Sequence, residues 1–222
     1  MKLIHFWFCP ASDRARLALA YKGIAHELIV PDYDEDELFF ELGIARTAPV
    51  VLWPDGGLET DSITLFAELD RRHAQPSLLG PLSATQWQAV LDWRTRATQV
   101  LDRLHAPVKA AYRGIGDDDG HLAAYKASVA ARWGMSVEEL ANDRYGAFAE
   151  LDQLTHLREL GGFLRVHRFY AGTLSAADIL MTADLFPLQL LDGVTLPIDL
   201  MYYFERVQEA CGVDLRAGLL AG

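Results

Sequence analysis

The hydrophobic pattern of this chain changes in kind near residue 72, and that change limits the folds open to it. Short apolar runs alternate with helical stretches up to this point, and the pattern beyond it is almost only helical. The stretch 73–82 contains glycine and prolines and has no periodicity, which is typical of a linker between packed domains. We therefore predict an α/β domain over residues 1–73, a linker over 74–82 and an all-helical domain over 83–222.

In the first domain, apolar runs bounded by turn residues predict strands, and the stretches between them predict helices. The first three elements form a βαβ unit, and the later strands form a hairpin around the turn 54–57. The predicted strands are 3–8, 25–30 and 50–53 with a partner beginning at 58, and the predicted helices are 14–22, a short one after 32–37, and 62–72.

Residue pairs that match the capping box mark helix starts in the second domain. They are Ser83 with Gln86, Ser136 with Glu139, and Ser175 with Asp178. The last pair, in which aspartate takes the third position, opens a stretch so apolar that it cannot lie on a surface. We predict a central buried helix here, with Ser175 and Asp178 as a structural cap rather than a catalytic site.

Charge and composition exclude several classes of function. The 222 residues carry a formal net charge of −11, so nucleic acid and anionic membranes would meet repulsion. No apolar run approaches the roughly 20 residues of a bilayer span, and the first residues lack the features of a signal peptide, so we expect a cytoplasmic protein. The histidines show no paired spacing of metal ligands, and no glycine loop suits a phosphate, so no metal or nucleotide site is predicted.

The motif Cys9-Pro10-Ala11-Ser12 points to chemistry, because it joins the first predicted strand to the first helix. Pro10 fits the first helical position, which places Cys9 at the N-cap, where the helix dipole and free N–H groups favour a thiolate. The alternative is that Cys9 is a small buried apolar residue. The other cysteine, Cys211, lies at the far end of the chain, so the pattern is not that of a disulfide framework and suits a reducing compartment.

Together these features resemble the glutathione transferase superfamily, in which a thioredoxin-like domain precedes an all-helical domain. The resemblance covers nearly the whole chain and is closest to the cysteine-type members, especially two-domain glutaredoxin 2 proteins, with omega-class transferases next. It rests on Cys9-Pro10-Ala11-Ser12, Ala48-Pro49-Val50, Asp61-Ser62 and Ser175 to Asp178.

The resemblance implies a glutathione site around the third strand. It implies a cis bond before Pro49, with the backbone of Ala48 paired to the cysteine of glutathione. The alternative is an ordinary trans proline at a strand start. It further implies that Ser62 binds the γ-glutamyl carboxylate, that Asp61 assists at the ammonium, and that Arg46 pairs with the glycyl carboxylate. Asp61 and Ser62 could instead only cap a helix, and Arg46 could be a solvated surface charge.

By the same resemblance, the activity is thiol-disulfide exchange with glutathione. Dithiol glutaredoxins have a second cysteine where this chain has Ser12, so we predict monothiol chemistry in which Ser12 hydrogen-bonds the Cys9 thiolate. The partners are then glutathione and a small-molecule or protein thiol or disulfide. Two alternatives stay open: a transferase that conjugates glutathione to small electrophiles, and a non-catalytic interaction module. The closer resemblance favours a monomer over a homodimer.

Overall fold

The computed structural model describes residues 1–220, and its first part is built on a four-stranded sheet in the order β2-β1-β3-β4. β1 pairs in parallel with β2, whereas β3 is antiparallel to both β1 and β4. The strands are β1 (Lys2–Ile4), β2 (Glu27–Ile29), β3 (Val50–Leu52) and β4 (Leu58–Glu59). β1 is shorter than the predicted strand 3–8, because the chain turns directly before Cys9, whose N–H donates to the Phe6 carbonyl at 3.1 Å.

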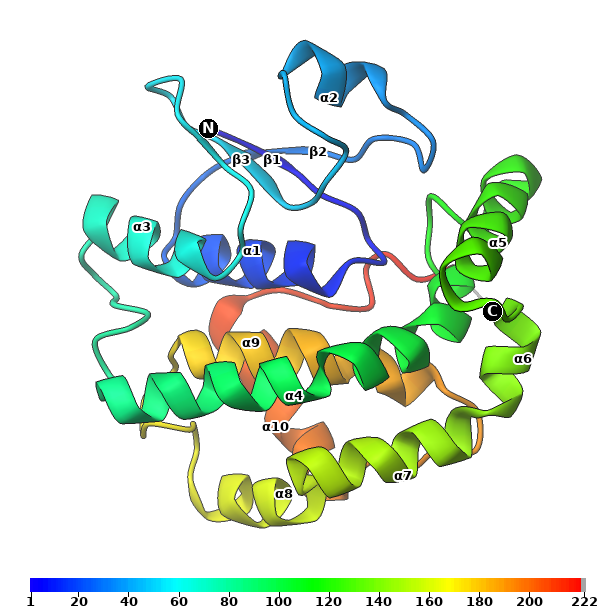
Figure 1. The fold of residues 1–222 in the computed structure, drawn as a ribbon. Helices are drawn as coiled ribbons and strands as arrows, with labels where there is room; N and C mark the ends of the chain where they lie inside the picture. The colour runs from blue at the N-terminus through cyan, green and yellow to red at the C-terminus, as the bar shows by residue number, and fades with distance from the viewer. Residues whose placement is uncertain (221–222) are drawn as a thin grey trace.

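The two faces of the sheet bury alternate residues of its central strands, as the pleat requires. Leu3 and Val51 point into a core shared with Leu17 of helix α1, whereas Ile4 and Val50 point into a smaller core on the other face. Figure 1 shows helix α2 on one side of the sheet and helices α1 and α3 on the other. These helices are α1 (Pro10–Tyr21), α2 (Glu37–Glu41) and α3 (Thr64–Arg72).

From Ala84 onward the described chain is mainly helical. The helices are α4 (Ala84–Val108), η1 (Lys109–Ala111), α5 (Asp119–Trp133), α6 (Val137–Asn142), α7 (Arg144–Thr155), α8 (Leu157–Val166), α9 (Ala176–Leu185), η2 (Phe186–Leu190) and α10 (Ile198–Cys211). None of the helices within residues 1–220 combines the length and the apolar character that a bilayer span requires.

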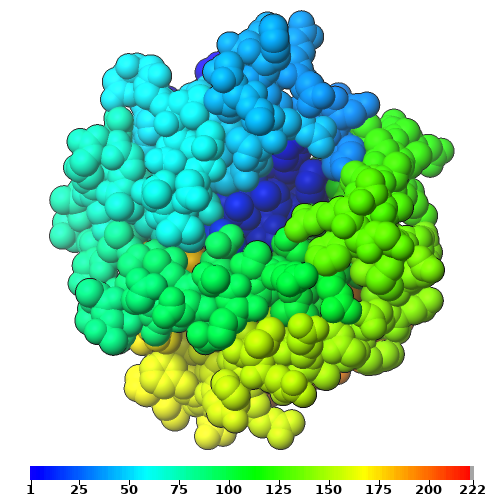
Figure 2. All heavy atoms as spheres, viewed as in Figure 1, coloured from blue at the N-terminus to red at the C-terminus, as the bar shows by residue number. Residues whose placement is uncertain are grey.

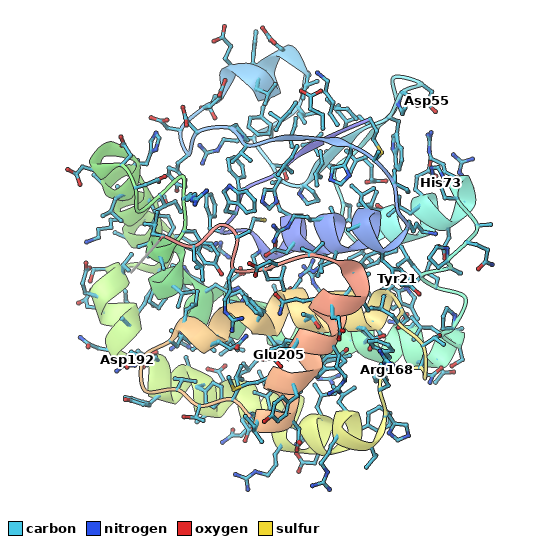
Figure 3. All side chains as sticks on the ribbon, turned by 180° about the vertical axis from the view of Figure 1, so that it is seen from behind. Tyr21, Asp55, His73, Arg168, Asp192 and Glu205 are labelled. Carbon is cyan, nitrogen blue, oxygen red and sulfur yellow. The ribbon has the colours of Figure 1, made fainter. Side chains whose placement is uncertain are left out.

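Helix α9 is the central helix of the second part, and every one of its residues is buried. It packs against α1, and α10 packs against both helices. In Figure 3, seen from behind, α10 with its exposed Glu205 covers this region, and Tyr21 marks the end of α1 that lies away from Cys9. One continuous hydrophobic core therefore runs from the sheet through α1 and α9 into the helical part.

The segment between α3 and α4 is held by a buried lysine. Lys22 donates to the carbonyls of His73 and Pro76 at 2.6 and 2.7 Å and forms an ion pair with Asp70 at 2.7 Å. Asp70 in turn accepts from the backbone N–H groups of Leu78 and Leu79. These charge-assisted contacts fix how the two parts of the chain follow one another.

Candidate functional site

Cys9 lies at the N-cap of α1, with Pro10 in the first turn as predicted. Its backbone is extended, with φ −110° and ψ 109°, and its side chain makes no capping hydrogen bond. The residue is partly exposed, and within residues 1–220 its Sγ donates only to the carbonyl oxygen of Ala48, at 3.8 Å. The sulfur therefore lies at the positive end of a helix, beside a backbone group of a neighbouring loop and within reach of solvent.

The bond between Ala48 and Pro49 is cis, which confirms that prediction. Pro49 immediately precedes β3, and the register of β3 against β1 brings this loop to the end of the sheet that leads into α1. Residues 48 and 9 thus meet although they are far apart in the sequence.

A cavity of about 140 Å³ adjoins Cys9 between the two parts of the molecule. In Figure 2, seen from the same side as Figure 1, the surface is hollowed. Atoms of the first residues lie at the bottom of the hollow, and atoms of the helical part lie below it in the picture. Its lining comes from α1 (Pro10, Ala11, Arg14), from one side of α4 (Arg94, Thr98, Leu101, Asp102, His105) and from Asp184 of α9, in addition to Cys9. The cavity is therefore more polar than a purely hydrophobic binding cleft.

Arg14 is the buried cation of this cavity, and sequence reasoning missed it. Its guanidinium donates to Ser62 Oγ at 3.0 Å and to Asp184 Oδ1, while its Nε has no hydrogen-bond partner among residues 1–220. Arg14 and Asp184 are both nearly fully buried. The sequence held one signal for this pair: Arg14 and Asp184 are charged residues within two stretches whose pattern is otherwise typical of buried helices.

His105 completes the buried polar group. Its Nε2 lies 2.8 Å from the Asp184 carbonyl oxygen, so this nitrogen carries the proton and donates it. Burial, followed by the charge of Lys109, lowers the pKa of His105 to about 4. The imidazole is therefore neutral near pH 7 and adds no positive charge to the cavity.

The predicted pair at the start of α3 divides into an exposed and a buried residue. The exposed Asp61 accepts from the backbone N–H groups of Ile63 and Thr64 at 2.7 and 2.8 Å, so its carboxylate caps the helix start. Ser62 is 5% exposed and turns toward Arg14. The structure thus brings Ser62 to the cavity wall through Arg14, whereas Asp61 faces outward.

Ser12 and Arg46 lie in surroundings that the sequence did not indicate. Ser12 is fully buried, and its Oγ accepts from the Phe6 N–H at 3.3 Å. Arg46 donates to the Tyr33 carbonyl, lies over the Tyr33 ring at 4.9 Å and approaches Asp36 at 3.8 Å. Their proposed contacts with the thiolate and with the glycyl carboxylate stay predictions.

Cys211 differs from Cys9 in its accessibility, because it is buried whereas Cys9 is partly exposed. It is 6% exposed, and burial, followed by the charge of Asp178, raises the pKa of its thiol to about 12. Both cysteines are free. A buried thiol of this kind neither attacks nor resolves a disulfide at neutral pH.

No group of histidine, cysteine and acidic side chains in the part of the chain that the structure describes is arranged to hold a metal ion.

Comparisons with known proteins agree with this architecture. Residues 3–77 match the family model described as glutathione S-transferase, N-terminal domain. Among solved structures, glutaredoxin 2 from Salmonella typhimurium in complex with glutathione has a TM-score of 0.79 at 20% identity, covering 96% of this chain and 95% of that one. A search of curated proteins found no match.

Two glutathione S-transferases give similar results. The enzyme of Ceriporiopsis subvermispora in complex with glutathione has a TM-score of 0.71 at 18% identity, covering 95% of this chain and 97% of that one. The enzyme from Rhodospirillum rubrum has a TM-score of 0.61 at 19% identity, covering 95% and 85%. The fold class predicted from the sequence is confirmed: a small mixed sheet with helices followed by a helical part, as in glutathione transferases and glutaredoxin 2.

Proposed function

We propose that this chain, which has the fold of glutathione transferases and glutaredoxin 2, is a glutathione-dependent thiol-disulfide oxidoreductase that works through Cys9. One observation carries the proposal: the Cys9 sulfur lies partly exposed at the start of α1, beside the Ala48 carbonyl and at the edge of the cavity. A thiol placed at the positive end of a helix and open space for a disulfide are what thiol-disulfide exchange requires.

The residues around Cys9 fit glutathione as the co-substrate. The backbone of Ala48 can pair with its cysteinyl part, since this carbonyl already lies 3.8 Å from the sulfur. Ser62 and the Arg14 guanidinium, whose Nε is buried without a partner, offer hydrogen-bond donors to a carboxylate. Asp61 at the same helix start offers a carboxylate to an ammonium group. The family model over residues 3–77 and the glutathione-bound solved structures support the same assignment.

The reaction proceeds by two exchanges. In the first, the Cys9 thiolate attacks the glutathione sulfur of a mixed disulfide; a Cys9–glutathione disulfide forms, and the substrate leaves as its thiolate, which then takes up a proton. In the second, the thiolate of another glutathione attacks the same glutathione sulfur, so that oxidised glutathione leaves and the Cys9 thiolate returns. The net reaction consumes one free glutathione thiol and converts the glutathione mixed disulfide into the substrate thiol and oxidised glutathione.

The buried state of Cys211 makes the chemistry monothiol. A resolving cysteine must reach the mixed disulfide as a thiolate, and Cys211 is buried with its thiol pKa raised to about 12. Ser12 occupies the position where a dithiol enzyme has its second cysteine. Glutathione itself must therefore complete the cycle. We further expect a monomer in a reducing compartment such as the cytoplasm.

A second candidate function is the conjugation of glutathione to small electrophiles, since the similar solved structures include glutathione S-transferases. It predicts turnover that survives the loss of Cys9.

The decisive experiment is the intact mass of the protein after incubation with oxidised glutathione and again after addition of reduced glutathione. We expect wild type and Cys211→Ser to gain one glutathione and lose it again, and Cys9→Ser to gain none. An unmodified wild type would exclude the exchange mechanism. Conjugation activity in Cys9→Ser would then favour the second candidate.

A further inference from the structure

Beyond helix α10 the described chain ends in a segment of irregular backbone, residues 213–220, which we call the C-terminal strap. In Figure 1 the strap, drawn in red, runs between α1 and the helical part and passes beside the blue turn that leads into α1. Leu215 anchors its first half, because this side chain is buried and its N–H donates to Gln208 Oε1 at 2.8 Å. The strap is therefore packed against the molecule and does not extend into solvent.

The second half of the strap is bound to the chain that follows α4. The Gly218 carbonyl accepts from the Arg113 N–H at 2.9 Å, and the Leu220 N–H donates to the Ala111 carbonyl at 2.9 Å. These two backbone hydrogen bonds attach the strap to the helical part at Gly218 and directly after it. Gly218 is thus held on one side by a segment with fixed ends.

The other side of Gly218 rests on Trp7. A Cβ at position 218 would lie 2.5 Å from Trp7 Cβ and 2.7 Å from Trp7 Cγ, which is closer than side chains pack. Because these atoms adjoin the Trp7 backbone, rotation of the indole could not make room, and either the strap or the turn at Trp7 would have to move. The φ of Gly218 is not positive, so the close approach and not the backbone conformation requires glycine here.

Trp7 is one of the two central residues of the turn that ends at Cys9. The Cys9 N–H closes this turn by donating to the Phe6 carbonyl at 3.1 Å, so Trp7 and Phe8 lie between the hydrogen-bonded residues. Away from the strap, the Trp7 ring faces the Arg16 guanidinium, which lies 5.0 Å from the ring centroid. Arg16 belongs to α1. Trp7 therefore connects the strap with the helix that begins at Cys9.

We propose that Gly218 is a positioning residue for Cys9. By seating the strap on Trp7, it fixes the turn 6–9 and thereby the place of the Cys9 sulfur at the positive end of α1. The inference rests on the proposed function, in which this sulfur is the nucleophile. Its place matters because the effect of the helix dipole is confined to the first turn, and because attack on a disulfide requires the attacking atom to be aligned. The end of the helical part thus acts on the nucleophile without contacting glutathione.

The test measures the sulfur directly, through the pH profile of its alkylation by iodoacetamide. All proteins carry Cys211→Ser, so that Cys9 is the only thiol of the chain, and the protein with this change alone is the parent. Gly218→Ala and Gly218→Val add one and three carbons against Trp7. Ala217→Val is the matched control, because Ala217 is exposed on the same strap. Values of kcat/KM for a glutathione mixed disulfide and thermal unfolding are measured on the same proteins.

Gly218→Val should move the midpoint of the alkylation profile by about half a pH unit toward higher pH and lower kcat/KM about tenfold, because the sulfur is displaced from the helix start. Gly218→Ala should change both quantities in the same direction by less. Ala217→Val should keep the parent's rates within about twofold. If Gly218→Val does not fold, Gly218→Ala decides, and Trp7→Ala, which removes the ring beneath the strap, should give the same shift.

Two results would overturn the inference. Lower thermal stability in Gly218→Val with an unchanged alkylation profile would mean that the strap stabilises the fold without positioning Cys9. An equal shift in Ala217→Val would mean that the contact with Trp7 is not the cause. Failure of the proposed function is distinguishable, because the parent would then react with iodoacetamide but gain no glutathione from oxidised glutathione, and the comparison between variants would still decide the role of Gly218.

Discussion

Helices α1 and α9 begin at opposite sides of one core, and the N-termini of the two helices are capped differently. Both starts leave backbone N–H groups without partners inside the helix. At α9, the Asp178 carboxylate accepts from Ser175 N–H, Ser175 Oγ, Tyr170 N–H and the Tyr203 hydroxyl. At α1, the N-cap is Cys9, whose side chain makes no capping bond.

The start of α9 at Ser175 is a closed start, because its polar groups have buried protein partners, including the Leu78 carbonyl that accepts from the Ala176 N–H. The start of α1 at Cys9 is an open start that stays available to a ligand. Asp178 is fully buried and its partners satisfy it, so no molecule can enter there. The N–H groups at the start of α1 have a weakly polar sulfur beside them, and that sulfur is partly exposed. The N–H groups at a helix start can bind a ligand when no side chain caps them and they lie next to open space.

The largest expected effect concerns the open start. Cys9→Ser should lower disulfide reduction with glutathione by about 10³-fold or more, because a hydroxyl does not replace a thiolate in the exchange reaction. Cys211→Ser is the matched control and should keep the wild-type rate, since Cys211 is buried. Steady-state turnover of a glutathione mixed disulfide measures both. Equal losses in the two variants would remove the distinction between the two cysteines.

Substitutions at the closed start of α9 should lower the stability of the protein and leave the chemistry at Cys9 unchanged. Asp178→Ala should lower the free energy of unfolding by about 3 kcal/mol, because it leaves several buried donors without an acceptor. Ser136→Ala removes an exposed capping box and should cost about 1 kcal/mol. Urea denaturation measures both variants. Similar losses would mean that Asp178 is no more than an ordinary cap.

The closed start could be predicted from the sequence, because a capping box is formed by two residues three positions apart. Ser83 with Gln86 and Ser136 with Glu139 both form capping boxes, as predicted. The same holds for the buried α9, whose apolar run is continuous in the sequence. Local patterns therefore sufficed for these helix starts, whereas the cis bond before Pro49 and the thioredoxin-like fold class were predicted from the resemblance to glutathione transferases.

The lining of the cavity beside Cys9 could not be predicted from the sequence, because it depends on contacts between residues that are distant in the chain. Arg14 and Asp184 are 170 positions apart and meet only when α1 packs against α9. Arg94 reads as an ordinary polar residue of an amphipathic helix. Ser12 was assigned to the thiolate from its place in the motif, and the sequence did not indicate that its buried hydroxyl accepts from the Phe6 N–H. Side-chain direction at such positions is set by tertiary packing and leaves no local signal.

The chain leading into α1 also contains a buried polar side chain without partners, in contrast to Asp178. His5 is fully buried, and neither ring nitrogen has a hydrogen-bond partner among the described residues. Burial, followed by the charges of Arg16 and His26, lowers the pKa of His5 from 6.5 to about 3. Below pH 6.5 the unfolded chain therefore binds a proton that the folded chain does not, so stability falls as the pH falls toward 3.

His5→Phe should remove this part of the acid sensitivity. Between pH 6.5 and pH 5 the wild type should lose about 2 kcal/mol more free energy of unfolding than the variant does. Denaturant unfolding at the two pH values gives the difference, and turnover at pH 7 reports whether the Cys9 site is preserved. Parallel pH profiles for the two proteins would show that His5 is protonated in the folded state.

The smallest expected effect is that of replacing Ser12. It tests whether the Ser12 hydroxyl stabilises the fold or hydrogen-bonds the Cys9 thiolate. Ser12 follows Cys9 by three positions, as a capping partner or a thiolate donor would, yet its Oγ accepts from the Phe6 N–H at 3.3 Å. Ser12→Ala should therefore cost about 1 kcal/mol of stability, since a buried N–H loses its acceptor. The rate of Cys9 modification by iodoacetamide should stay within about twofold at every pH. A displaced pH profile of that rate would instead mean that the hydroxyl turns to the sulfur once the thiolate forms, and α1 would then have a cap that closes only around its charged nucleophile.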